Sequence, residues 1–336
     1  MSALSTQVQL VSRPVGWPKS EDFRTVQVEL PDLADGEVRV ENEFISVDPY
    51  MRGRMIDTRS YIPPFALGET MTGGAVGRVV ESRSDDLPVG ALVLHQQGWR
   101  DVAAGPAAGF SRLPEPPQGT QSSVYLGIFG MTGLTAYVGL TVIAQMKPDD
   151  VVFISGAAGA VGTAAGQIAR LLGASSVIGS AGGAAKVDLL TSRYGYDAAI
   201  DYKAGPVREQ LRAAATNGID VYFDNVGGDH LEAALDSFND GGRAALCGAI
   251  SAYNSTEPQP GPRNMSTIIS RGLTLRGFTL GGYFGYAKEF NEKMAQWYGE
   301  GKIVYDETVV DGIDHSVDAF IGMMRGENIG KMVVRI

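Results

Sequence analysis

The chain has 336 residues, 44% of them hydrophobic and 20% charged, a balance typical of a globular protein long enough for two cores. Its net charge of −10 argues against nucleic acid or an anionic membrane as the main partner, because either would need a basic surface. No apolar run approaches the length of a membrane span, and the first residues lack a basic region followed by an apolar core. We therefore expect a cytoplasmic protein.

Cysteine and histidine are too scarce for a zinc protein. The single cysteine, Cys247, excludes an intrachain disulfide and fits a reducing compartment. The three histidines, at 95, 230 and 315, are far apart in the sequence. A structural zinc site needs about four Cys or His ligands and a catalytic one about three. The sequence therefore predicts a site without metal.

The chain alternates two kinds of secondary-structure pattern. Up to about residue 125, short apolar runs separated by Pro and Gly turns predict a β-rich domain with strands at 25–30, 37–47, 74–81 and 91–95. A helix of small residues follows at 130–144, and strands then alternate with helices, which predicts a doubly wound parallel sheet of the α/β class. The six predicted strands of this sheet are 151–155, 176–180, 198–201, 220–223, 243–247 and 273–278. The last segment predicts a helix at 286–300, a strand at 308–310, a helix at 316–325 and a strand at 331–336, and its strands are expected to rejoin the first domain.

The segment 151–173, VVFISGAAGAVGTAAGQIARLLG, is the most informative motif. It joins an apolar strand to a helix through closely spaced glycines in the pattern AxGxxG, with Ala157 in the place of the usual first glycine. Gly159 allows backbone to approach a pyrophosphate, and Gly162 allows the helix to pack closely on the strand. The helix N-terminus then offers free N–H groups and positive dipole to the phosphates. This pattern predicts a dinucleotide site.

The second strand of this unit indicates which dinucleotide is bound. An NAD site usually carries Asp or Glu about 20 residues after the glycines, to accept the ribose hydroxyls. Here the strand 176–180 is followed by Ala181, Gly182 and Gly183, with Lys186 close behind and no acid before Asp188. A carboxylate would repel a 2′-phosphate, whereas a lysine attracts it. The sequence therefore favours NADPH.

Six motifs spread over the chain carry a family resemblance. They are VDPYMR at 47–52, AAGAVG at 157–162, DYK at 201–203, YFDNVGG at 222–228, CGAIS at 247–251 and NIGKMVV at 328–334. With them the chain closely resembles the zinc-free medium-chain dehydrogenase/reductases of the leukotriene B4 12-hydroxydehydrogenase, prostaglandin reductase, alkenal double-bond reductase and curcumin reductase group. Zinc-dependent relatives carry Gly-His where this chain has Gly68-Glu69, which again indicates a site without zinc.

The resemblance implies a domain plan and a set of cofactor-binding residues. A GroES-like catalytic domain would take 1–126 and 300–336, a Rossmann domain would take 127–299, and the protein would be a homodimer. Gly159, Ala160, Val161 and Gly162 would line the pyrophosphate, while Lys186 and Tyr202 would hold the 2′-phosphate. The remaining cofactor contacts implied are Asn225, Cys247, Phe278 and Asn328.

The resemblance also implies a reaction, the reduction of the C=C bond of α,β-unsaturated aldehydes and ketones. Hydride would reach the β-carbon, and a donor would be needed at the carbonyl oxygen, where charge develops. Tyr253, Tyr61 and Tyr50 are the candidate donors, with Tyr253 preferred because its loop leaves the sheet at the carboxyl edge. Each ring is alternatively an apolar wall of the cleft. An NADPH quinone oxidoreductase and a non-catalytic NADPH-binding protein remain alternative functions.

Overall fold

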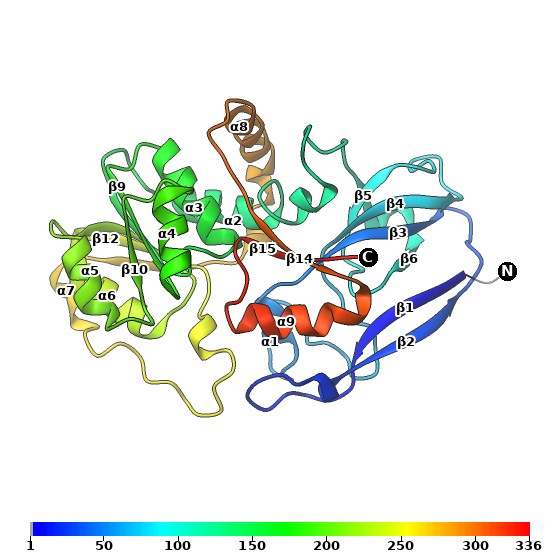
Figure 1. Ribbon diagram of the computed structural model, residues 1–336, viewed down its shortest axis with the longest axis horizontal. Helices are drawn as coiled ribbons and strands as arrows, with labels where there is room; N and C mark the ends of the chain where they lie inside the picture. Colours follow the sequence, from blue (N-terminus) through cyan, green and yellow to red (C-terminus); the bar gives the residue numbers. More distant parts are fainter. Residues whose placement is uncertain (1–2) are drawn as a thin grey trace. The chain divides into compact units, whose positions relative to one another are not determined.

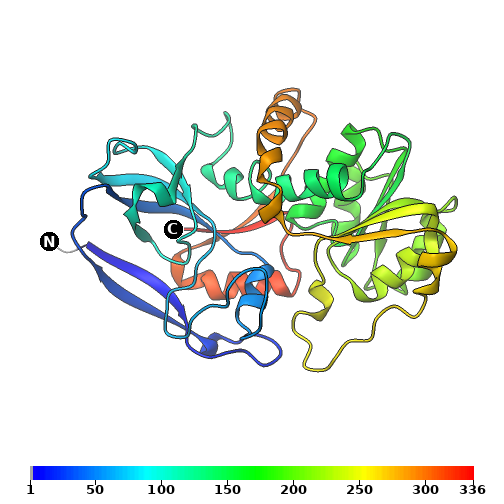
Figure 2. The ribbon, with the colours of Figure 1, turned by 180° about the vertical axis from the view of Figure 1, so that it is seen from behind.

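The computed structural model describes residues 3–336 and divides the chain into two compact units. One unit contains the chain up to Gly127 together with Glu307–Ile336, and the other contains Ile128–Asp306. Figures 1 and 2 show their elements from opposite sides. Within the described residues, no helix is both long enough and apolar enough to cross a membrane.

The unit Ile128–Asp306 is built on a six-stranded parallel sheet in the order β10-β9-β8-β11-β12-β13. All six strands predicted from the sequence are present, which confirms the α/β fold class. The strands are β8 (Val151–Ile154), β9 (Ser176–Ala181), β10 (Ala198–Asp201), β11 (Ile219–Asp224), β12 (Phe238–Leu246) and β13 (Thr274–Gly277). The helices are α2 (Met131–Val138, continued by a π-helical turn at Gly139–Ile143), α3 (Ala160–Leu171), α4 (Ala184–Ser192), α5 (Val207–Ala214), α6 (Gly228–Ser237), α7 (Ser266–Ser270) and α8 (Ala287–Gly299).

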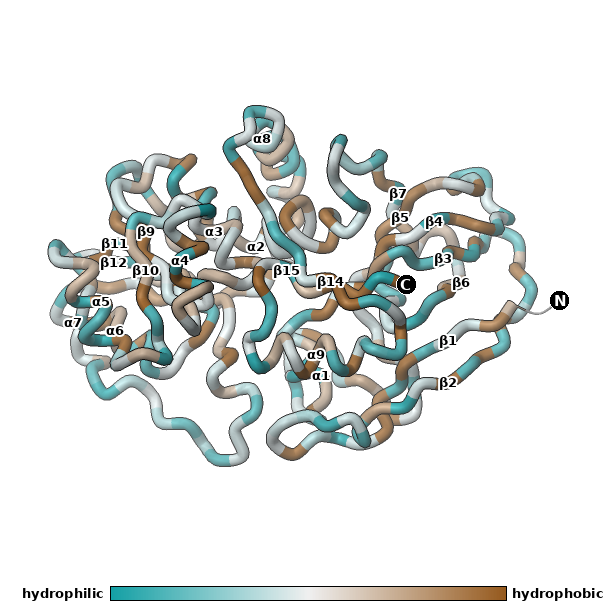
Figure 3. Tube along the Cα trace, in the orientation of Figure 1, coloured by the Kyte–Doolittle hydropathy of each residue, from teal (hydrophilic) through white to brown (hydrophobic). Residues whose placement is uncertain are grey.

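The strands of this sheet are hydrophobic on both sides, because helices cover both faces of the sheet. Phe153 of β8 and Tyr222 of β11 are fully buried and stack with their ring centroids 5.0 Å apart. Figure 3 colours hydrophobic residues brown, and brown segments run through the interior of this unit. Right-handed crossovers place α3 and α4 on one face and α5 and α6 on the other, because the chain reverses its direction across the sheet after β10. This reversal brings the carboxyl ends of β8 and β11 together, where open α/β sheets bind ligands.

The other unit contains a seven-stranded mixed sheet, ordered β14-β15-β3-β4-β5-β7 with β6 also paired to β3, and a separate β1-β2 pair. Its core packs apolar residues from five strands, among them Val38, Val79, Val93, Ala103 and Phe110. The two C-terminal strands join this mixed sheet through β15, which runs antiparallel to β3. The elements are β1 (Ala3–Leu10), β2 (Phe23–Leu30), β3 (Glu37–Ser46), α1 (Tyr50–Arg54), β4 (Ala75–Ser82), β5 (Leu92–His95), β6 (Val102–Pro106), β7 (Phe110–Arg112), β14 (Glu307–Asp311), α9 (Ser316–Met324) and β15 (Lys331–Arg335).

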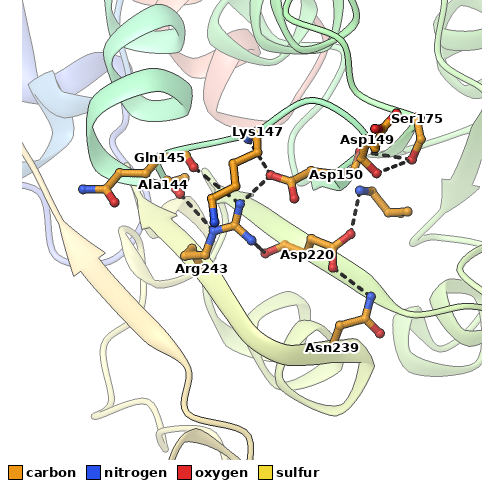
Figure 4. Close-up of polar contacts among 10 residues, drawn as sticks. Ala144, Gln145, Lys147, Asp149, Asp150, Ser175, Asp220, Asn239 and Arg243 are labelled. Carbon is orange, nitrogen blue, oxygen red and sulfur yellow. Dashed lines mark hydrogen bonds and ion pairs between the residues drawn. The ribbon is translucent and has the colours of Figure 1, made fainter.

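Polar side chains close the amino-terminal edge of the parallel sheet (Figure 4). The Arg243 guanidinium forms an ion pair with Asp150 and donates to the carbonyl oxygen of Ala144 at 3.3 Å. Asp220 accepts the Val151 N–H at 2.9 Å and the Asn239 side-chain amide at 2.9 Å. These groups satisfy backbone atoms where the strands begin, so this edge is held by internal hydrogen bonds.

Candidate functional site

The carboxyl edge of the parallel sheet gathers most of the residues predicted to bind the cofactor. In a parallel sheet the carboxyl ends of all strands lie at the same edge. Each of these residues follows one strand: Gly159, Ala160, Val161 and Gly162 after β8, Lys186 after β9, Tyr202 after β10, Asn225 after β11, Cys247 after β12 and Phe278 after β13. Asn328 lies in the other unit, just before β15, where its amide donates to the Gly330 carbonyl oxygen at 2.8 Å. The cofactor roles of all these residues stay predictions.

The turn between β8 and α3 leaves no space for side chains at its closest contact. A Cβ added to Gly162 would lie 2.4 Å from the carbonyl oxygen of Gly156 and 2.5 Å from the Cα of Ala157. Gly159 precedes the helix as its N-cap, and a Cβ there would be 3.3 Å from the same carbonyl oxygen. The first N–H groups of α3 have no partner within the helix, so they point toward whatever occupies the turn.

A buried carboxylate, Asp224 at the end of β11, organises the neighbouring loops. One oxygen accepts hydrogen bonds from the Tyr222 hydroxyl at 2.7 Å and from the Gly227 N–H at 2.7 Å. The Ser155 hydroxyl donates to the same oxygen at 3.1 Å and accepts the Asn225 N–H at 2.9 Å. Burial raises the pKa of Asp224, and these hydrogen bonds oppose that rise. Asp224 lies inside the YFDNVGG motif but was not among the predicted site residues.

Positive charge collects where β9 and β10 end. Lys186, in the first turn of α4, has its pKa lowered by burial and by the charge of Lys203. A Cβ on Gly182 would lie 2.6 Å from the Tyr202 hydroxyl and 3.0 Å from the Lys203 Cε, so both side chains extend over this glycine. The Asp201 carboxylate accepts the Gly183 N–H at 2.8 Å and the Lys203 N–H at 2.9 Å, which lowers its pKa. Lys203 was quoted only within the DYK motif and is a further candidate here.

Two predicted residues meet in the loop after β12. The Tyr253 hydroxyl accepts the Ala249 N–H at 3.4 Å and would lie 3.3 Å from a Cβ on Gly248, so the phenol folds back over the end of the strand. Burial is the main cause that raises the Tyr253 pKa. Burial, with the nearby Asp224 charge, also raises the pKa of the Cys247 thiol, to about 12. Such a thiol is not a nucleophile at neutral pH.

Phe278 follows β13 and contacts the rings of Phe223 and Tyr283 edge-on, with centroids 6.3 and 6.4 Å apart. A Cβ on Gly139, in the π-helical turn, would lie 2.3 Å from the Phe223 ring and 3.1 Å from that of Phe278. The chain therefore fixes the Phe278 ring from two sides.

Tyr50 and Tyr61 belong to the other unit, where Arg54 connects their two segments. Tyr50 begins α1, its hydroxyl is hydrogen-bonded to Arg54, and burial raises its pKa. Arg54 also donates to the Pro63 carbonyl oxygen at 3.0 Å and to the Thr72 hydroxyl at 2.9 Å. Tyr61 is 67% exposed and interacts electrostatically with both Tyr50 and Arg54. Sequence reasoning did not identify Arg54, because its partners come from a loop without regular structure.

The Tyr50 segment is anchored by a buried ion pair. Lys331, at the start of β15, donates to the Val47 carbonyl oxygen at 2.7 Å and lies 3.1 Å from the Asp48 carboxylate. The second Asp48 oxygen accepts the Ser46 hydroxyl at 2.5 Å. Removing one partner would leave the other charge buried, so the pair holds the VDPYMR segment in one place.

The carboxyl edge fits a phosphorylated dinucleotide on its own geometry. The glycine turn excludes side chains where a pyrophosphate would lie, and two lysines converge where the second strand ends. Among residues 3–336 no group of three or more His, Cys, Asp or Glu side chains is placed to hold a metal ion. Such a combination of fold and edge is characteristic of dinucleotide-dependent oxidoreductases.

Comparison with known proteins gives the family. Residues 6–113 match the N-terminal domain of oxidoreductase family, and residues 160–300 match the family described as zinc-binding dehydrogenase. The chain is 40% identical over 332 residues to the NADPH-dependent curcumin reductase of Escherichia coli, covering 97% of this chain and 95% of that protein. It is 41% identical over 325 residues to prostaglandin reductase 1 of Bos taurus, covering 96% of each. The crystal structure of CurA in complex with NADPH from Vibrio vulnificus has a TM-score of 0.92 and 41% identity, covering 98% of each chain.

The chain therefore belongs to the medium-chain dehydrogenase/reductase family that contains curcumin reductase and prostaglandin reductase 1. This confirms the family resemblance identified from the sequence motifs. The Escherichia coli quinone oxidoreductase, at 24% identity and a TM-score of 0.78, shares the fold alone.

Proposed function

We propose that this protein uses NADPH to reduce the C=C bond of α,β-unsaturated aldehydes and ketones. Its relatives support the cofactor, since the curcumin reductase of Escherichia coli is NADPH-dependent and CurA of Vibrio vulnificus was crystallised with NADPH. The observation that carries the proposal is the gathering of glycine turn, lysine pair and Tyr253 at one sheet edge. When bound, NADPH supplies the hydride that adds to the β-carbon of the substrate.

The residues of this chain bind the cofactor and handle the proton. The N–H groups of the α3 turn and the lysines at 186 and 203 hold phosphate, and the Asp224 network keeps the loops after β11 and β12 in place. The Tyr253 oxygen accepts the Ala249 N–H, which leaves its O–H to donate to the substrate carbonyl oxygen, where charge develops. The same phenol can then protonate the α-carbon.

The first test is NADPH oxidation at 340 nm, with NADH in parallel, against 2-nonenal, 4-phenyl-3-buten-2-one, curcumin and a benzoquinone. We expect saturated carbonyl products, identified by mass spectrometry, and a strong preference for NADPH. Turnover of the quinone alone would instead favour the quinone oxidoreductase function. Binding of NADPH without any oxidation would favour the non-catalytic function.

Tyr253→Phe tests the proton donor. Loss of the hydroxyl should lower kcat by about tenfold to a hundredfold with little change in the KM for NADPH. Because the Tyr253 pKa is raised, the wild-type phenol stays protonated through neutral pH, and kcat should not fall between pH 7 and about 9 for this reason. Tyr286→Phe, in the same unit, is the control. An unchanged kcat in Tyr253→Phe would transfer the role to Tyr50 or Tyr61.

We also propose a homodimer, formed through β13. This strand is the last of the parallel sheet, its Thr274 and Arg276 are exposed, and Ile269 of nearby α7 is 86% exposed. An edge strand offers backbone groups that a second copy can pair with about a two-fold axis. Light scattering after size-exclusion chromatography should give twice the 35.6 kDa of one chain. The mass of a single chain would refute the proposal.

A further inference from the structure

A buried histidine lies beneath the region where the lysines converge. The Nε2 atom of His230, in the first turn of α6, is 2.8 Å from the Ser180 hydroxyl. Ser180 is fully buried near the end of β9, and His230 is only 5% exposed. Since α4 and α6 cover opposite faces of the sheet, His230 reaches β9 from the face opposite to Lys186.

Ser180 stands at the place that distinguishes NAD sites from NADP sites. In an NAD site the end of the second strand usually carries an acid for the ribose hydroxyls. Here the Ser180 carbonyl oxygen accepts the Ala157 N–H at 2.9 Å, which ties β9 to the glycine turn. Its hydroxyl is bonded to His230. The residue is therefore held through its backbone on one side and through its side chain on the other.

His230 also contacts the tyrosine predicted to hold the 2′-phosphate. The Tyr202 and His230 rings meet edge-on, with centroids 5.7 Å apart and planes at 73°. Tyr202 is 42% exposed, and its hydroxyl extends over Gly182 beside Lys203. One imidazole thus touches both a buried polar residue of β9 and an exposed ring above the same edge.

The chemistry of the imidazole suits this position. Burial lowers the His230 pKa to about 4, so the ring is neutral at pH 7 and adds no charge to the nearby lysines. A phenylalanine would keep an aromatic ring beside Tyr202, but it would leave the buried Ser180 hydroxyl without this hydrogen bond, which is costly. The histidine is therefore more than a space-filling side chain.

We propose that His230 is a positioning residue for the 2′-phosphate subsite, which it orders by fixing Ser180 and Tyr202 from below. The proposal rests on the proposed use of NADPH and deepens it, because it assigns cofactor preference to a residue outside the lysine pair. Its effect should appear only for ligands that carry the 2′-phosphate.

The experiment compares two probes that differ in that phosphate alone, 2′,5′-ADP and 5′-AMP, by calorimetry on the intact protein without substrate. His230→Phe should weaken 2′,5′-ADP binding about tenfold and 5′-AMP binding less than about twofold, as loss of one buried hydrogen bond predicts. Ser180→Ala should weaken 2′,5′-ADP about threefold, and the double variant should not exceed the larger single effect. In turnover, the preference for NADPH over NADH in kcat/KM should fall about tenfold while kcat at saturating NADPH is kept.

The chain offers a matched control in His95. This residue is also buried, and its Nε2 lies 2.8 Å from the Asn42 side-chain oxygen. Its ring packs against that of Phe110, with the two centroids 4.9 Å apart. His95→Phe should lower the melting temperature and leave both affinities unchanged. His230→Asn retains a polar side chain and serves if His230→Phe does not fold.

The outcomes separate this proposal from the proposed reaction. Equal weakening of both probes, or no weakening of either, in a folded His230 variant would overturn the positioning role. Wild-type protein that does not discriminate between the probes would overturn the cofactor assignment and the positioning role together. Selective binding that is lost in His230→Phe would support the positioning role even if no enone were turned over.

Discussion

The two edges of the parallel sheet carry similar residue types and use them differently. At the amino edge, Arg243, Asp150 and Asp220 all bind partners of this chain, backbone atoms among them (Figure 4). At the carboxyl edge, Asp224 is satisfied internally in the same way, but the first N–H groups of α3 have no partner within the helix, and the charge of Lys203 acts on Lys186.

The difference shows how a binding edge can be distinguished from a structural one. A charged group whose partners are all internal stabilises the fold. Two lysines at the same sheet edge as the N–H groups of a helix N-terminus instead attract an anionic ligand. Substitutions at the amino edge should therefore change stability, and substitutions at the carboxyl edge should change affinity.

The largest effect should come from Gly162→Ala. The new Cβ would lie 2.4 Å from a backbone oxygen and 2.5 Å from a backbone carbon, so the turn itself must move. Such overpacking should weaken NADPH binding roughly tenfold to a hundredfold, as measured by the fluorescence of bound NADPH. Gly159→Ala, whose Cβ would be 3.3 Å from the carbonyl oxygen of Gly156, should weaken binding less than about tenfold. If Gly162→Ala kept the wild-type affinity for NADPH, the turn would not be part of the binding site.

This edge could largely be predicted from the sequence. Buried parallel strands form nearly continuous apolar runs, such as those ending at Ile154 and Phe223, and glycines follow each run within a few residues. Once the strands are placed, the parallel arrangement alone brings the following loops to one edge. The strands β1, β6 and β7 were missed: the middle of β1 is mostly polar, β6 contains Gly105 and ends at a proline, and β7 has only three residues.

The interactions between loops could not be predicted in the same way. Asp224 meets Ser155 across 69 residues, and His230 meets Ser180 across 50. Both separations are far longer than any single helix or strand described here, so no local pattern of residues indicates these pairs. Arg54 likewise depends on the conformation of the loop that contains Pro63. These contacts required the fold itself.

An intermediate effect is expected at the amino edge from Arg243→Met. The Arg243 side chain is 19% exposed and that of its partner Asp150 is 11% exposed, so removing the guanidinium leaves a mostly buried carboxylate without its cation. Stability should fall by about 2–4 kcal/mol, seen as a melting temperature lower by roughly 5 °C or more. The dissociation constant for NADPH should stay within about twofold.

Arg208→Met provides the matched control, because Arg208 pairs with Asp236 while it is 49% exposed. Surface pairs contribute about 0–1 kcal/mol, so this variant should melt close to the wild type. A large loss of NADPH affinity in Arg243→Met would contradict the division between the two edges.

The smallest effect should come from Cys247, which lies at the binding edge without taking part in the chemistry. Because its pKa is raised to about 12, the thiol stays protonated at pH 8, and alkylation by iodoacetamide should be about a thousandfold slower than for a free thiol. Cys247→Ala should keep kcat within about twofold, since the backbone N–H of this residue, bonded to the Asp224 carbonyl oxygen at 2.8 Å, is retained. Rapid labelling at pH 8 would show that this thiol is accessible and ionised. A large loss of kcat in Cys247→Ala would show that the thiol takes part in the reaction, contrary to the role expected from its raised pKa.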